Sequence, residues 1–187
     1  FTDTTAPRML KGRSATDALI LGDVDGDEAL DLLCGDGHRV LLYLNDGRGG
    51  LREAGATKMP QGKLDPVSLL LADLDGDGDL DLVCGNGGYD LQSRLFLNDG
   101  RGTFKDATAT RMPPNKNGGY PVVSGDVDGD GDVDLIWGRF RQDILYLNDG
   151  RGYFSDASTG RLPAYSKGAT IVLSLLDVDG DQDLDLV

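Results

Sequence analysis

Aspartate is concentrated in short segments of the chain, at a spacing that suits the binding of a metal ion. The segment "DVDGDGDVD" at residues 126–134 places five carboxylates at alternate positions within nine residues. Their mutual repulsion opposes a compact turn unless a cation lies between the side chains. Calcium takes about six to eight oxygen ligands and tolerates irregular geometry. Alternating aspartates around glycine therefore predict a calcium-binding turn.

This acidic segment recurs, which favours a metal-binding repeat over an isolated disordered run or a solvated charged face. Related segments begin at Asp23, Asp73, Asp126 and Asp177, at intervals of 50, 53 and 51 residues. A fixed interval of this size indicates a repeat architecture. A second series, "YLNDGRGGL", "FLNDGRGTF" and "YLNDGRGYF", begins at residues 43, 96 and 146. The chain divides into units 1–50, 51–103, 104–153 and 154–187, and the last unit is shorter than the others.

Each unit has the pattern of short strands. Around the first acidic segment and the "NDGRG" turn that follows it, "DALILG", "ALDLLCG", "RVLLYL" and "LREAGA" are aliphatic stretches bounded by glycine, asparagine and aspartate. The "NDG" tripeptide suits a tight hairpin, because these residues tolerate positive φ. Four antiparallel strands in each unit of about 50 residues are the blade pattern of a β-propeller. We therefore expect an all-β chain with three complete blades and one partial blade, forming part of a larger propeller.

The acidic segments together with "LYLNDGRGYF" closely resemble the FG-GAP or VCBS repeat family, whose blades build integrin α-type propellers. The resemblance covers essentially the whole chain. It implies four calcium ions, each held by side-chain oxygens at loop positions 1, 3, 5 and 9 and by the backbone carbonyl at position 7. The implied ligands are Asp23, Asp25, Asp27, Ala29 and Asp31; Asp73, Asp75, Asp77, Asp79 and Asp81; Asp126, Asp128, Asp130, Asp132 and Asp134; and Asp177, Asp179, Asp181, Asp183 and Asp185.

Two other calcium motifs do not fit the spacing of these loops. An EF-hand needs a glutamate at position 12, where this chain has Cys34, Cys84 or Trp137. Tandem nonapeptide calcium repeats recur every nine residues, whereas these loops lie about 50 residues apart. Both cysteines are expected to be small buried residues without a disulfide. Tyr43, Phe96 and Tyr146 share one repeated strand position, and we expect their side chains in the core.

Charge and hydropathy exclude several classes of partner. The net charge is −14, and the four acidic segments hold 20 of the 32 acidic residues. The negative field of such a chain opposes the binding of nucleic acid. No apolar run approaches the length of a membrane span. Extracellular calcium-binding modules have Kd values of roughly 10⁻⁴ to 10⁻³ M, far above cytosolic calcium levels. We therefore expect an extracellular, periplasmic or cell-surface location.

Topology predicts where a partner binds. In a propeller blade the acidic loop and the "NDGRG" turn share one face, where Arg48, Arg101 and Arg151 are expected near the carboxylates. Variable loops occupy the opposite face, and Arg8, Lys58, Arg111 and Arg161 are expected at the start of one set of them. The candidate ligand-binding residues in the variable loops are Tyr89, Tyr120, Arg139, Phe140, Arg141 and Tyr165.

Two functions remain open from the sequence. The first is a secreted, calcium-stabilised adhesion or protein-recognition module; the second is a lectin-like module or an accessory domain of a secreted carbohydrate-active enzyme. Catalysis by these residues is not expected, because the single histidine, His38, lies in a loop and the calcium loops account for most carboxylates. The further blades are expected from additional sequence or from another copy of the chain, with residues 1–6 and 184–187 at the open edges.

Overall fold

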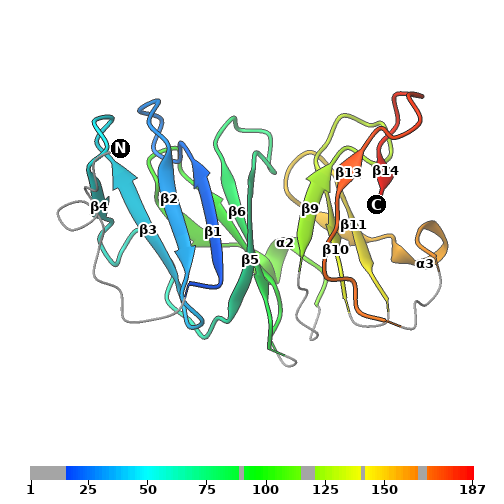
Figure 1. Cartoon of the computed structure of the whole chain (residues 1–187), viewed down its shortest axis with the longest axis horizontal. Coiled ribbons are helices and arrows are strands. Elements are labelled where there is room, and N and C mark those ends of the chain that lie inside the picture. Colours follow the sequence, from blue (N-terminus) through cyan, green and yellow to red (C-terminus); the bar gives the residue numbers. More distant parts are fainter. Residues whose placement is uncertain (1–15, 89–90, 115–120, 140–141, 164–167) are drawn as a thin grey trace, which may run out of the picture.

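The computed structural model describes residues 16–88, 91–114, 121–139, 142–163 and 168–187. Within these ranges the chain forms three four-stranded antiparallel sheets and one two-stranded hairpin, and each sheet is ordered as its strands follow in sequence. Figure 1 shows the sheets succeeding one another across the molecule, from blue to red. The all-β propeller-blade fold expected from the sequence is confirmed, and the described strands do not close into a ring.

The strands have the following bounds. The first sheet contains β1 (Ala18–Gly22), β2 (Asp31–Gly35), β3 (Val40–Asn45) and β4 (Leu51–Glu53). The second contains β5 (Pro66–Ala72), β6 (Asp81–Asn86), β7 (Arg94–Asn98) and β8 (Phe104–Asp106). The third contains β9 (Val122–Gly125), β10 (Asp134–Trp137), β11 (Ile144–Asn148) and β12 (Phe154–Asp156). The hairpin pairs β13 (Leu175–Leu176) with β14 (Asp185–Leu186).

The sheets are offset from the sequence units, because the first residues of the second, third and fourth units form the last strand of the preceding sheet. β4, for example, begins at Leu51 and pairs with β3. One-turn helices, α2 (Thr108–Arg111) and α3 (Ser158–Arg161), follow β8 and β12. No described helix is long or apolar enough to span a bilayer.

Hydrophobic side chains fill the space between neighbouring sheets. Strand β6 is buried along its whole length: Leu82 and Cys84 pack with the first sheet, and Val83 packs with the third. A central strand covered on both faces carries apolar side chains on both, as Leu82, Val83 and Cys84 do here. The expected core residues are buried, with Tyr43 9 %, Phe96 2 % and Tyr146 1 % exposed. Both cysteines are buried and free, as the repeat positions predicted.

One face of the first sheet lacks a neighbour among the described residues. Leu71 and Leu80 of the second sheet lie against Gly22 of the first, where an added Cβ would come within 2.6 and 3.1 Å of their Cδ1 atoms. The repeat equivalents in the first sheet, Leu21 and Leu30, are 59 % and 55 % exposed. The pairing expected for residues 1–6 lies outside the described residues, while at the other end Val187 exchanges backbone hydrogen bonds with Ser174.

An asparagine joins each later sheet to the one before it. The Asn98 Nδ2 donates to Leu80 O of its own sheet at 3.1 Å and to Val24 O of the first sheet at 2.9 Å. Asn148 repeats the arrangement with Val133 O and Leu74 O. Both asparagines are 7 % exposed. A buried carbonyl without a donor is costly, so the "N" of "NDGRG" stabilises the junction between sheets as well as its own turn.

Replacing Asn98 with alanine tests this junction. Asn98→Ala leaves the Val24 and Leu80 carbonyls without their donor, so we expect a loss of about 3 kcal/mol in the free energy of unfolding. Asn45→Ala is the matched control, because Asn45 Nδ2 donates to one exposed carbonyl, Leu30 O, at 3.0 Å. Denaturant unfolding should show a loss of about 1 kcal/mol for this control. Equal losses in the two variants would contradict a stabilising bond between sheets.

Candidate metal centres

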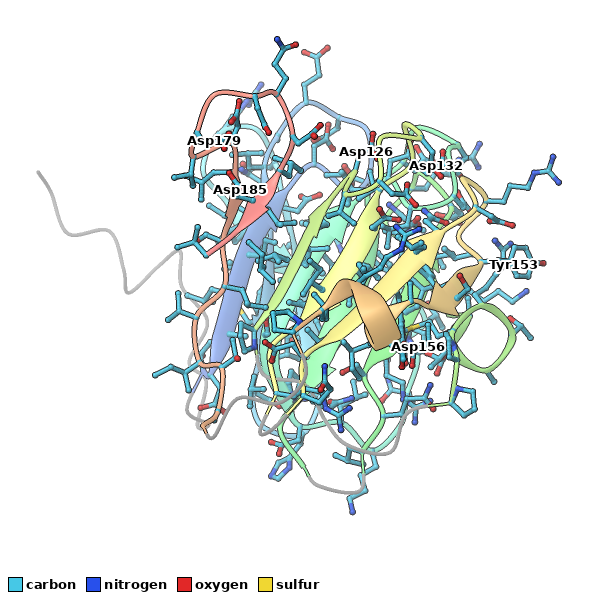
Figure 2. The ribbon with its side chains drawn as sticks, turned by 90° about the vertical axis from the view of Figure 1, so that its right-hand side faces the viewer. Asp126, Asp132, Tyr153, Asp156, Asp179 and Asp185 are labelled. Atoms are coloured by element: carbon cyan, nitrogen blue, oxygen red, sulfur yellow. The ribbon has the colours of Figure 1, made fainter. Side chains whose placement is uncertain are left out.

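The four acidic loops, residues 23–31, 73–81, 126–134 and 177–185, all join the first strand of a sheet or hairpin to the second. Figure 1 shows them at the same end of the molecule, at the top of the view. Figure 2 shows Asp126 and Asp132 at the upper end of the third sheet, with Asp179 and Asp185 in the neighbouring hairpin. The repeat therefore places every loop in an equivalent position.

The aspartate at position 1 holds each turn together through backbone N–H groups. Asp73 Oδ1 accepts from Gly76 N at 2.9 Å and its Oδ2 accepts from Gly78 N at 3.0 Å. The same pair of bonds recurs at Asp23, Asp126 and Asp177. The position-4 glycine has positive φ in all four loops, between 76° and 82°. This sharp turn brings the alternating carboxylates to one side of the loop.

In the three four-stranded sheets, the aspartate at position 9 is buried at the base of the loop. Asp81, the first residue of β6, is 0 % exposed. Its Oδ2 accepts from Leu74 N at 3.1 Å and its Oδ1 from Asn98 N at 2.8 Å. Burial raises the pKa of Asp81 to about 7, although these N–H groups oppose the rise. Burial likewise raises the pKa values of Asp31 and Asp134. A nearby cation would favour the charged form of all three.

In each loop, three carboxylates place one oxygen apiece within 4.8 Å of one another. The groups are Asp23, Asp25 and Asp27; Asp73, Asp75 and Asp81; Asp126, Asp128 and Asp134; and Asp177, Asp179 and Asp185. The groups in the last three loops combine positions 1, 3 and 9, and the group in the first combines positions 1, 3 and 5. The structure thus brings together three of the four side-chain ligands expected in every loop.

The position-3 aspartates provide the observation that tests whether a cation fits. Asp25 Oδ1 and Asp75 Oδ1 are buried and have no hydrogen-bond partner. A buried carboxylate oxygen without a donor is costly, and both atoms belong to residues of the three-carboxylate groups. Hard oxygen ligands of this kind suit calcium or magnesium. These residues therefore fit a hard divalent cation.

The expected ligands at positions 5 and 7 interact with each other. Asp77 Oδ1 accepts from Asp79 N at 3.0 Å, and the other three loops repeat this bond at 2.9 or 3.0 Å. Asp77, Asp130 and Asp181 are not members of the three-carboxylate groups. The position-7 carbonyls of Ala29, Asp79, Asp132 and Asp183 remain predicted ligands.

Three basic residues lie beside the acidic loops and not on the opposite face, where the sequence led us to expect them. We call Lys58, Arg111 and Arg161 the loop cations. Arg161 Nη1 lies 3.3 Å from Asp128 Oδ2. Burial and Asp77 raise the pKa of Asp75, and Arg111 opposes that rise, as Lys58 does at Asp25. The last strand of each sheet has three residues, so the chain leaves the sheet early and a long basic side chain reaches the loop. Arg8 lies outside the described residues.

From the sequence we expected the arginines of the "NDGRG" turns near the carboxylates of the acidic loops. The loop cations occupy that position instead. Among the described residues, the one salt bridge to an acidic loop belongs to Arg161. The turn arginines Arg101 and Arg151 instead offer their backbone carbonyls to Lys58 and Arg111. From the sequence we did not place the loop cations beside the acidic loops. The signal that could have indicated this was their shared position within their units.

Of the six candidate ligand-binding residues, Arg139 lies within the described ranges. It is half-buried, and burial lowers the pKa of its guanidinium. Its N–H donates to Asp143 Oδ1 at 2.8 Å and its carbonyl accepts from Thr170 N at 3.0 Å. The backbone of this loop residue is therefore fixed. Tyr89, Tyr120, Phe140, Arg141 and Tyr165 lie outside the described residues.

Comparison with known proteins agrees with the repeat geometry. A sequence profile of the FG-GAP-like repeat matches residues 23–84, 73–137 and 126–187. The chain belongs to the FG-GAP-like repeat family. No curated protein matches this FG-GAP-like chain.

Two solved structures resemble the fold. The Tc holotoxin pore of Photorhabdus luminescens is 24 % identical with a TM-score of 0.50, and the match covers 90 % of this chain and 8 % of that one. An Agrocybe aegerita lectin that recognises non-reducing terminal N-acetylglucosamine is 23 % identical with a TM-score of 0.49, covering 73 % and 36 % of the two chains. This chain therefore spans well under two thirds of either one.

Position 6 of the acidic loops differs between repeats in a way that affects stability. Gly78 and Gly131 have φ of 91° and 93°, and the equivalent residues Glu28 and Gln182 have φ of 70° and 76°. The left-handed region is unfavourable for residues with a Cβ.

We expect Glu28→Gly to raise the free energy of unfolding by about 1 kcal/mol, measured by denaturant unfolding in excess chelator. Glu28→Gln is the control for charge, and an equal gain in that variant would attribute the effect to repulsion and not to backbone strain.

Proposed function

We propose that this chain is a calcium-stabilised recognition module that binds a protein partner. The observation that carries the proposal is the set of four carboxylate groups, two of which contain buried oxygens without a donor. Calcium supports the loop by lying among carboxylates that otherwise repel one another. Residues at positions 1, 3 and 9 would hold it in the last three loops, and residues at positions 1, 3 and 5 in the first.

Calcium would change the charge balance of the molecule. Four divalent ions add eight positive charges to a formal net charge of −14, which leaves −6. With Kd values of roughly 10⁻⁴ to 10⁻³ M, each site contributes on the order of 1 kcal/mol at millimolar calcium. Because cytosolic calcium leaves such sites largely empty, we propose an extracellular, periplasmic or cell-surface location.

The proposed recognition surface is the variable-loop face, opposite the acidic loops. The loops between the second and third strands of the sheets lie at this end, which is the lower end in Figure 1. On its described part, Arg39 is exposed and pairs with Asp36 at 3.2 Å. Exposed loops on a rigid β scaffold are common sites of binding, and a charged, exposed pair of this kind suits a protein partner.

A second candidate, glycan binding, is supported by a polar hollow beside the edge of the second sheet. Gln61 and Gly62 line it together with Arg94 and Asp106, whose side chains pair at 3.2 Å. Paired donors and acceptors around a shallow hollow suit the hydroxyl groups of a sugar. The hollow gives the glycan candidate a defined location that can be tested by substitution.

The proposal gives the chain no catalytic role, because most of its carboxylates belong to the acidic loops. The further blades expected from the sequence, or a second copy of the chain, also remain a proposal. Leu21 and Leu30 support it, since their equivalents Leu71 and Leu80 pack against the preceding sheet at Gly22.

Calcium should raise the melting temperature. We expect four sites to raise it by on the order of 10 °C in millimolar calcium relative to excess chelator. Asp75→Asn should lose about a quarter of this rise, because it removes a charged ligand from one loop of four. Glu53→Gln, which removes a carboxylate from outside the loops, should keep the whole rise. Differential scanning calorimetry measures the effect, and a rise no larger than that produced by equimolar sodium salt would refute the structural role of calcium.

An array of purified glycans separates the two candidate partners. For a protein-recognition module in calcium we expect no glycan signal above that of the chelated protein. A calcium-dependent glycan signal that Arg94→Ala abolishes would favour the glycan candidate and locate it in the hollow. Arg39→Ala is the matched control, because it also removes an exposed arginine from a salt bridge but lies outside the hollow.

A further inference from the structure

The loop cations occupy the same place in the three four-stranded sheets. Lys58, Arg111 and Arg161 each lie five residues after the end of a sheet's last strand, at Glu53, Asp106 and Asp156 respectively. Each acts on the position-3 aspartate of the acidic loop in its own sheet: Arg161 forms an ion pair with Asp128, and the charges of Lys58 and Arg111 oppose the rise in the pKa values of Asp25 and Asp75. A basic side chain beside a metal ligand affects how strongly that ligand attracts an ion.

Arg111 shows the arrangement most fully. Its Nη1 donates to the backbone carbonyl of Arg151 in the third sheet, and its guanidinium carbon lies 4.1 Å from the centre of the Tyr153 ring. An added Cβ on Gly152 would come within 3.2 Å of Arg111 Nη1 and 3.1 Å of Asp75 Cβ. The guanidinium therefore lies where the acidic loop of the second sheet meets the turn of the third, on the side where Figure 2 shows Tyr153.

Lys58 repeats this arrangement one sheet earlier. Its Nζ donates to Arg101 O and, at 3.1 Å, to Thr103 Oγ1, both in the turn of the second sheet. An added Cβ on Gly102 would lie 3.5 Å from Asp25 Cβ, so this turn also lies beside the acidic loop of the preceding sheet. Arg161 forms an ion pair with Asp128.

The loop frame does not depend on these cations. Asp73 and Asp81 hold the second loop through backbone N–H groups. Removing the Arg111 charge therefore leaves the turn in place but leaves the carboxylates of the loop with less positive charge nearby. In the metal-free protein that charge offsets repulsion, and once calcium is bound the same charge repels the ion.

We propose that the loop cations are built-in counter-charges that compete with calcium for the position-3 aspartates. When calcium is absent, Lys58 and Arg111 stabilise the junction between sheets and Arg161 stabilises its own loop, and all three weaken the binding of calcium to the adjacent loop. This inference rests on the proposed function, because it describes how the loop cations affect the binding of calcium. It makes the loop cations determinants of calcium affinity although they are not ligands.

A site-resolved calcium titration tests the inference. The N–H groups of Gly26, Gly76, Gly129 and Gly180 each donate to the position-1 aspartate of a different loop, so their NMR signals report on the four loops separately. In Arg111→Met we expect the Gly76 midpoint to move to calcium concentrations lower by about fivefold. The Gly26 and Gly180 midpoints should stay at wild-type values. The metal-free variant should also melt at a lower temperature than the metal-free wild type.

Two further variants complete the test. Arg111→Lys keeps the charge and should restore the wild-type Gly76 midpoint. Arg161→Met should move the Gly129 midpoint alone, and it replaces Arg111→Met if that variant does not fold. An unchanged or higher midpoint at the affected loop, or a common shift of all four glycines, would overturn the inference. If no glycine of the wild-type protein responds to calcium, the proposed function fails instead.

Discussion

Repulsion among the carboxylates of each acidic loop is the interaction that the surrounding structure must offset. Asp73 is held by two backbone N–H groups and Asp81 by two more, one of them from the neighbouring β7. These bonds fix the carboxylates in place but do not neutralise them. Burial still raises the pKa of Asp81 to about 7. A positive charge near the loop is therefore needed for the folded chain to keep these groups ionised at low cost.

The same loops form the junctions between sheets. Asn98 and Asn148 donate to carbonyls at position 2 of the preceding loop, and Lys58 and Arg111 reach from that loop to the following turn. Each sheet thus completes the surroundings of the one before it, as expected for a repeat whose units contact mainly their neighbours. The counter-charge of the loop and the packing between sheets are consequently linked through a few side chains.

The sequence predicted the strands, the two turns of the repeat and the aspartates that the structure brings together in the three-carboxylate groups. It could do so because an acidic loop is largely local: the bonds that shape its turn join residues two to seven positions apart. It misplaced Lys58, Arg111 and Arg161, because an expected full-length fourth strand would carry the chain to the opposite face. The strand ends after three residues, and no periodicity in "LRE", "FKD" or "FSD" indicates that length.

Residue type and spacing by themselves determined the repeat, the all-β class and the acidic turns, since these depend on φ, strand alternation and neighbouring charges. The tertiary structure decided which sheet faces which and what each turn contacts. The Nδ2 bonds of Asn98 to Val24 and of Asn148 to Leu74 both cross 74 residues. Gly22 is small because two leucines of the next sheet pack against it. Such contacts depend on how whole sheets orient, and the hydrophobic packing between the sheets sets that orientation.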